Sequence, residues 1–161
     1  MELPRPPPRL RSGFTLVEMM VVVAIVGILA SMTLPLARLG EQRVKERELR
    51  QALRDVRGAI DSYKKAGDEG RIVRKAGSSG YPESLDVLVN GVDSTGARAG
   101  RVYFLRRIPA DPFAQPELEP RVWGVRSYAS TAADPKPGDD VFDIFSFSAG
   151  VGTNGIAYRQ W

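Results

Sequence analysis

A long apolar run lies near the N-terminus, between Arg11 and Arg38, and its only charged side chain is that of Glu18. As a helix, residues 14–36 would be about 35 Å long, which is enough to cross the hydrocarbon core of a bilayer. A carboxylate in such a segment is costly unless it has a partner or a function. The pattern therefore predicts a transmembrane helix over residues 14–36 in which Glu18 has a specific role.

After this run the pattern changes to that of an amphipathic helix, which we expect to continue over residues 37–66. The large apolar residues recur at spacings of four and three and line one face: Leu49, Leu53, Val56, Ile60 and Tyr63. The other faces are polar and are expected to be solvated, with Arg43, Lys45, Glu46, Arg47, Glu48, Arg50, Arg54, Arg57 and Asp61. Gly67 and Gly70 supply the stop signal for this helix.

Residues 67–161 contain short apolar segments between loops, which predicts one small globular domain. A short helix is expected near residue 85, with Ser84 or Glu83 at its start. Residues 71–80 and 90–100 are expected to be loops, because both are rich in glycine and polar residues.

Two β-strands are expected late in the chain, over residues 122–130 and 141–148. Between them, residues 132–140 contain two prolines and a glycine, which prevents regular pairing in that segment. Such a connection is too short for a helical crossover, so the strands should be antiparallel. The expected fold class is α+β, with a long N-terminal helix packed on a small antiparallel sheet.

Composition argues against catalysis. The 161 residues include no histidine and no cysteine, so the commonest general base and all thiolate chemistry are missing. No nucleophile elbow or phosphate-binding glycine loop is present either, and we do not expect an enzyme. The net charge is +4, of which residues 1–13 contribute +2, and residues 41–65 hold eight basic and five acidic side chains. A mixed solvated surface is therefore expected there, and no nucleic-acid partner.

Residues 1–13 form a short, basic, proline-rich leader, and the string Gly13-Phe14-Thr15-Leu16-Val17-Glu18 follows at its end. Basic residues before an apolar run place that end in the cytoplasm. The arrangement resembles the signal of type IV pilins and type II secretion pseudopilins. The resemblance implies that a prepilin peptidase cuts between Gly13 and Phe14 and methylates Phe14, and that Glu18 pairs with the terminal amine of a neighbouring subunit. The alternative is an ordinary signal anchor, which has no use for Glu18.

Gly27 and Pro35 lie inside the apolar segment. Pro35 lacks the N–H of an interior helical residue, and Gly27 adds backbone freedom. A kink tolerated in a membrane helix is the simpler interpretation. The resemblance to pilins implies more, because that family often carries helix breakers at these two places. Residues 26–34 are then expected to loosen in an assembled filament.

Three motifs in the globular part are similar to those of the major pseudopilin of type II secretion. They are Tyr81-Pro82, the segment Ile108-Pro109-Ala110-Asp111-Pro112-Phe113, and Trp123-Gly124 followed by Tyr128. Residues 114–122 separate the second motif from the third, whereas the family usually runs them together. We expect most of these residues to form turns and packing contacts rather than a reactive site.

The same resemblance raises the question of calcium, which major pseudopilins commonly bind in the C-terminal loop. The family pattern has an Asp-Gly pair where this chain has Val151-Gly152, which puts inherited binding in doubt. Calcium needs several oxygen ligands, usually with two or more carboxylates. The candidate ligands are Asp139, Asp140 and Asp143, with Asp134 nearby in sequence. The alternative is that Asp139 and Asp140 are solvated turn residues.

The resemblance implies a structural subunit of a type II secretion pseudopilus that polymerises through its N-terminal helix and drives export of folded proteins. The implied partners are further copies of the chain, other pseudopilins, prepilin peptidase and an inner-membrane assembly platform. The implied location is the bacterial inner membrane, in a single pass, with residues 67–161 in the periplasm. A type IV pilus or competence pseudopilus subunit that binds surfaces or DNA is the alternative. The lack of a C-terminal disulfide favours secretion.

Overall fold

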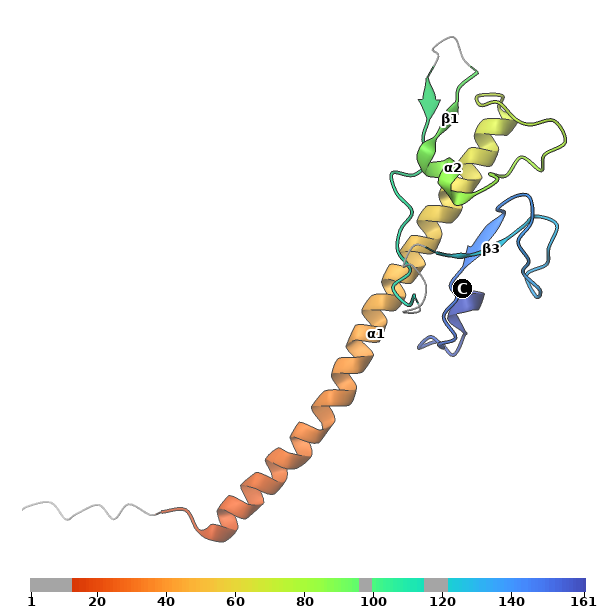
Figure 1. The fold of residues 1–161 in the computed structure, drawn as a ribbon. Coiled ribbons are helices and arrows are strands. Elements are labelled where there is room, and N and C mark those ends of the chain that lie inside the picture. Colours follow the sequence, from red (N-terminus) through yellow and green to blue (C-terminus); the bar gives the residue numbers. More distant parts are fainter. Residues whose placement is uncertain (1–12, 96–99, 115–121) are drawn as a thin grey trace, which may run out of the picture. The chain divides into compact units, whose positions relative to one another are not determined.

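The structure, a computed structural model, describes residues 13–95, 100–114 and 122–161, without the side chains of residues 32–38. Most of the predicted leader, residues 1–12, therefore lies outside the described residues. The chain divides into two compact units, Met1–Glu41 and Gln42–Trp161. Figure 1 labels the main elements along the sequence.

The first and longest element is helix α1, which covers Leu16–Asp68. Its C-terminal end is closed by a glycine turn, in which Gly70 has a φ of 69°. The Arg71 N–H donates to the Ala66 carbonyl at 2.8 Å, and the Gly70 N–H donates to the Gly67 carbonyl at 3.1 Å. This pair of bonds is the Schellman motif, which requires a left-handed residue that glycine adopts without steric cost.

The remaining elements are short. Helix α2 covers Leu85–Asn90, and a 3₁₀ turn, η1, covers Tyr158–Gln160. The strands form two antiparallel pairs, and their bounds are β1 Val92–Asp93, β2 Arg101–Val102, β3 Gly124–Arg126 and β4 Asp143–Phe145. The predicted α+β class is confirmed, with the helix packed against small antiparallel sheets.

Two expectations about these elements need correction, and the expected start of the short helix is met. The two late strands exist and pair as expected, but each is only three residues long, because the turns around them take up the flanking residues. The segment 90–100, which was expected to be a loop, holds strand β1. A strand of two residues is too short to show an alternating pattern in the sequence. Ser84 is the N-cap of α2, one of the two expected starts, although its side chain makes no capping hydrogen bond.

Strand β3 is paired with β4 in a register that sets Gly124 opposite Phe145. A Cβ atom on Gly124 would lie 2.3 Å from the Phe145 ring, closer than any real contact. Glycine is therefore required here because the aromatic ring of the neighbouring strand lies over its Cα. The Trp-Gly pair noted in the sequence is accordingly a packing motif, as expected.

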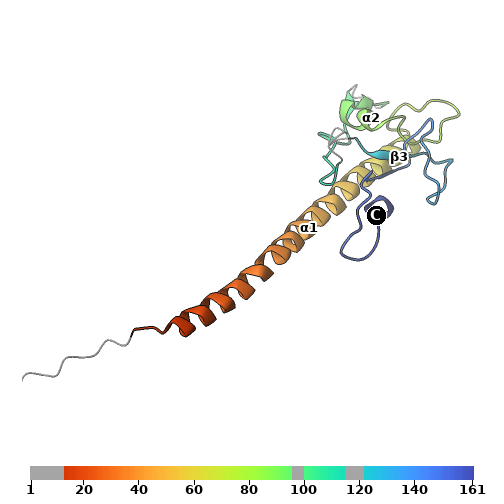
Figure 2. The same cartoon turned by 60° about the horizontal axis from the view of Figure 1, so that its bottom comes forward.

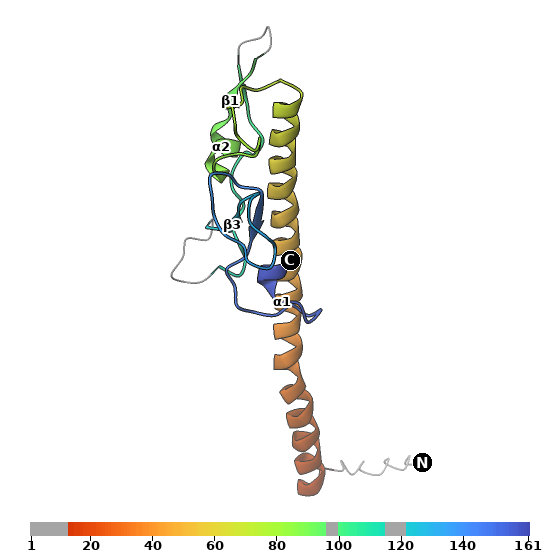
Figure 3. The same cartoon turned by 90° about the vertical axis from the view of Figure 1, so that its right-hand side faces the viewer.

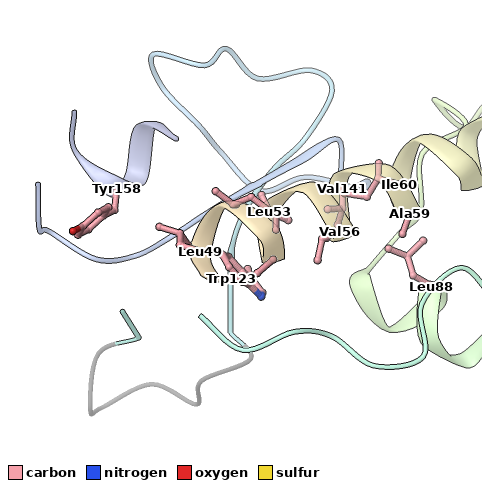
Figure 4. Close-up of a cluster of buried hydrophobic side chains, with 11 residues drawn as sticks. Leu49, Leu53, Val56, Ala59, Ile60, Leu88, Trp123, Val141 and Tyr158 are labelled. Atoms are coloured by element: carbon pink, nitrogen blue, oxygen red, sulfur yellow. The ribbon is translucent and has the colours of Figure 1, made fainter. Parts of the chain in front are cut away.

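The hydrophobic core of the second unit forms along one face of α1. Figure 2 and Figure 3 show α2 and β3 beside this part of the helix. Most of the predicted apolar face is buried, since Leu49, Val56 and Ile60 are at most 1% exposed, whereas Tyr63 is partly buried and packs against the core. In Figure 4 these residues lie together with Leu88 and Trp123. The other buried members of the core are Ala52, Leu53, Ala59, Val141, Ile144 and Tyr158.

Candidate functional site

The first candidate site is the start of α1. Gly13, Phe14 and Thr15 precede the helix, and Phe14 is 75% exposed. The Thr15 Oγ1 accepts a hydrogen bond from the Glu18 N–H at 3.2 Å, and the Thr15 carbonyl accepts one from the Met19 N–H at 3.1 Å. Thr15 is thus the N-cap, and Glu18 is the third helical residue. A carboxylate in the first turn is also favoured by the helix dipole.

The helix that follows exposes apolar side chains on all sides. Each of these side chains is between 45% and 75% exposed: Leu16, Val17, Met19, Met20, Val21, Val22, Val23, Ile25, Val26, Ile28 and Leu29. An exposed apolar surface of this extent marks a site of interaction with protein or lipid. Among the described side chains, no helix offers a stretch long and apolar enough to cross a membrane. The expected span 14–36 includes residues 32–36, whose side chains are outside the description.

The expected helix breakers do not interrupt α1, which is assigned as helix at both Gly27 and Pro35. A Cβ atom on Gly27 would meet nothing within 4 Å. Glycine is therefore not required at this position by close packing within the chain. The loosening of residues 26–34 concerns the filament, so it stays a prediction.

The Asp-Pro motif forms a buried polar link. The Asp111 side chain is 4% exposed, and its Oδ1 accepts the Phe113 N–H at 2.8 Å while its Oδ2 accepts the Ser146 hydroxyl at 2.6 Å. The Trp123 indole N–H donates to the Pro109 carbonyl at 3.0 Å. These bonds tie the turn to the residue that follows β4 and to the residue that precedes β3, which is the packing role expected from the sequence.

The three calcium candidates do not form a ligand set. Asp143 lies between two guanidinium groups, with Oδ1 2.7 Å from Arg57 Nε and Oδ2 3.2 Å from Arg126 Nη2. Asp140 Oδ1 accepts the Tyr128 N–H at 2.8 Å. Within the part of the chain that the structure describes, no three His, Cys, Asp or Glu side chains are grouped to hold a metal. Two arginines therefore already neutralise the Asp143 carboxylate, which leaves it poorly suited to hold calcium.

A second site lies where α1 meets the C-terminal loop, residues 150–157. Its centre is the Glu46 carboxylate, which is only 2% exposed. Glu46 Oε1 accepts the Thr153 N–H at 2.7 Å, and Oε2 accepts the Thr153 hydroxyl at 2.7 Å. The Tyr158 hydroxyl and the Gln42 amide also donate to Oε1, each at 3.2 Å. Arg50 Nη2 lies 3.8 Å from Oε2.

These contacts change the acidities of both titratable partners. Burial by itself would raise the pKa of the Glu46 carboxyl, but the hydrogen bonds from Thr153, Tyr158 and Gln42 outweigh it, so the pKa lies below its usual 4.5. Burial raises the pKa of the Tyr158 hydroxyl above its usual 10.0, and donation to Glu46 adds to the shift. Both shifts keep the carboxylate charged and the phenol protonated at neutral pH.

A third contact joins the same helix to the end of the chain through Arg57. In addition to Asp143, this guanidinium donates to the Ile144 carbonyl at 3.1 Å and to the Trp161 carbonyl at 2.7 Å. The Arg50 guanidinium lies over the indole of Trp161, with its Cζ atom 4.2 Å from the centroid of the indole ring. The C-terminal residue is thus held by two arginines of α1.

The sequence-based assignment of Glu46 to a solvated face is wrong, because Glu46 is buried, and Arg57 is only partly solvated, with 37% of its side chain exposed. The signal was present in the spacing, because Glu46 stands three residues before Leu49 and Arg57 stands four after Leu53. Both therefore extend or adjoin the buried stripe. The burial of Glu46 is tolerated because Thr153 and Tyr158 donate hydrogen bonds to it, and Arg57 is paired with Asp143. Among the described residues, no buried side-chain nitrogen or oxygen lacks a partner.

Comparison with known proteins gives two findings. The family model described as "Prokaryotic N-terminal methylation motif" matches residues 8–34. The "Type II secretion system core protein G" of Aeromonas hydrophila is 33% identical over 82% of this chain and 90% of its own length. The proteins of the same name from Pseudomonas aeruginosa and Klebsiella pneumoniae are each 30% identical, over 81% and 80% of this chain and 89% and 91% of their own lengths. No solved structure matches the chain.

The matched segment contains Gly13, Phe14 and Glu18, the residues on which the resemblance to pilins rested. The relatives extend that agreement over most of the globular part. The methylation motif, the α+β fold and these relatives agree, and the chain belongs to the core protein G family of type II secretion pseudopilins.

Proposed function

We propose that this protein is a structural subunit of a type II secretion pseudopilus, which polymerises through residues 14–36 to drive export of folded proteins across the outer membrane. The observation that supports it most is the N-terminal arrangement. Phe14 precedes the helix, Glu18 is in its first turn, and exposed apolar side chains follow. The relatives that match most of the chain carry the name of a secretion protein, which favours secretion over a type IV pilus or competence role.

In the proposed pathway, prepilin peptidase cuts after Gly13 and methylates the new terminal amine of Phe14. Methylation leaves that amine positively charged. The Glu18 carboxylate of one subunit then pairs with the Phe14 amine of its neighbour inside an apolar bundle. Pairing offsets the cost of burying each charge alone, so only the register that joins them is favourable.

The proposed location follows from the same steps. The subunit resides in the inner membrane, with residues 67–161 in the periplasm, and assembles on an inner-membrane platform with other pseudopilins. Gly27 and Pro35 let residues 26–34 loosen as the helices pack into the filament. The role is structural and requires no catalytic residue.

The experiment that tests entry into this pathway is an intact-mass measurement of the protein from membranes of cells with and without prepilin peptidase. A mature chain that begins at methylated Phe14, found only with the peptidase, is the expected result. A chain that retains residues 1–13 in both strains would identify an ordinary signal anchor and would refute the proposal.

The assembly step is tested by Glu18→Ala. The variant should be inserted and cleaved normally but should form no pseudopilus when cells overproduce it, because the register-setting ion pair is gone. Glu48→Ala is the matched control, since Glu48 is an exposed glutamate farther along the same helix. Filaments from Glu18→Ala at the wild-type level would exclude the pairing mechanism. Salt-sensitive binding of DNA by the pure protein would instead favour the competence alternative.

A further inference from the structure

The C-terminal loop, residues 150–157, has little secondary structure of its own. It contains one isolated bridge between Val151 and Ala157, and a turn in which Gly155 has a φ of 79°. The Gly152 N–H donates to the Ile156 carbonyl at 2.9 Å, and Asn154 Oδ1 accepts the Ile156 N–H at 3.0 Å. The Gly155 N–H also donates to the Gly152 carbonyl at 2.9 Å, and from α1 the Gln42 amide donates to the Val151 carbonyl at 3.3 Å. Because its internal bonds are all local, the loop needs anchors outside itself to remain in one conformation.

The loop has no carboxylate with which to bind a cation. Residues 146–158 contain no Asp or Glu. Its side-chain oxygens are already engaged, since the Thr153 hydroxyl donates to Glu46 and the Asn154 carbonyl oxygen accepts within the loop. Calcium needs six to eight oxygen ligands and generally two or more carboxylates. The residues present therefore do not fit the calcium that the family resemblance implies.

What the loop presents toward α1 is the opposite of a cation site. The Thr153 N–H, the Thr153 hydroxyl and the Tyr158 hydroxyl all point hydrogen-bond donors at one place, which the Glu46 carboxylate occupies. Hydrogen bonds to a charged acceptor are about twice as strong as neutral ones. Removing Glu46 would take away the shared acceptor of these donors, and the cost is greatest for the hydroxyl of Tyr158, which is only 3% exposed.

We propose that the Glu46 carboxylate, donated by the chain's own helix, fastens the C-terminal loop in place of a calcium ion, so that the subunit folds without calcium. The proposal also implies that a pseudopilus of this protein would assemble independently of calcium, and this consequence rests on the function proposed above. The inference that the subunit folds without calcium does not depend on that function.

Hydrogen exchange of the purified full-length mature chain in detergent tests this directly. The amides of residues 150–157 should exchange at the same rate with excess chelator and with excess calcium. In Glu46→Ala their exchange should rise by at least about tenfold and added calcium should not restore protection. Glu48→Ala, which changes an exposed glutamate two residues away on the same helix, should leave the rates unchanged.

Faster exchange of the loop in chelator, or unchanged exchange in Glu46→Ala, would overturn the proposal. If Glu46→Ala does not fold, Thr153→Val removes one hydroxyl donor and keeps the carboxylate. It should raise loop exchange by severalfold, and an unchanged rate would count against the Glu46 anchor. The readout does not depend on filaments. A chain with a calcium-independent loop that never enters a pseudopilus would support this inference while refuting the proposed function.

Discussion

Replacing Arg57 by alanine should destabilise the second unit even though the residue is on a helix face that the sequence predicts to be solvated. The substitution removes three hydrogen bonds: one to the Asp143 carboxylate at 2.7 Å, and two to the carbonyls of Ile144 and Trp161 at 3.1 and 2.7 Å. These contacts join α1 to β4 and to the C-terminal residue. Their loss should therefore loosen both at once.

The magnitude follows from exposure. The side chains of Arg57 and Asp143 are 37% and 27% exposed, so the ion pair is worth about 0.2–1 kcal/mol, as at a protein surface. Asp143 also keeps Arg126 at 3.2 Å and is not left uncompensated. The hydrogen bonds from Arg57 to the two backbone carbonyls have a charged donor, but water can reach that donor. Each bond should therefore contribute about 0.5–1 kcal/mol to the free energy of unfolding. We expect the free energy of unfolding to fall by about 2 kcal/mol.

Urea unfolding of the detergent-solubilised chain, followed by circular dichroism, measures this change. Arg54→Ala is the matched control, because Arg54 is exposed on the same helix and its side chain donates to that of Gln51, one turn away, at 2.8 Å. It should stay within about 0.5 kcal/mol of wild type. Arg57→Lys should fall between the two, since an ammonium keeps the charge but not the fork that contacts three acceptors. Equal stability of Arg57→Ala and Arg54→Ala would refute the reasoning.

Two further predictions concern the core and the effect of acid. Leu53→Ala should lower the free energy of unfolding by about 2–5 kcal/mol, because Leu53 is 2% exposed within the core. Urea unfolding measures this change, and Leu39→Ala, at a residue that is 51% exposed, is the control. Because the Glu46 pKa is below 4.5 in the folded chain, its contribution to stability is complete above about pH 4.5 and is lost as pH falls through the folded value. Unfolding titrations should therefore show a steeper loss of stability in acid for wild type than for Glu46→Gln, and identical slopes would contradict this.

Much of the architecture could be predicted from local patterns. The four-and-three spacing of Leu49, Leu53, Val56 and Ile60 predicts the buried stripe, because side chains at that spacing share a face of any α-helix. Gly70 predicts the helix end, because a left-handed residue is needed there whatever the domain looks like. The apolar run with its single charge at Glu18 likewise predicts the N-terminal helix from one continuous segment of sequence. Each of these signals depends only on neighbours in sequence.

Only the tertiary structure shows which groups are contacted by the polar residues beside the buried stripe of α1 and in the loops. Glu46 binds Thr153 across 107 positions of sequence, and Arg57 reaches Trp161 across 104. No local pattern reveals such partners, and without them a charged residue is assigned to solvent by default. The same holds for Asp143, a plausible metal ligand by composition that two arginines neutralise in the folded chain. The sequence alone thus determines which faces are apolar, whereas the burial of a charge depends on donors and acceptors that only the tertiary fold brings together.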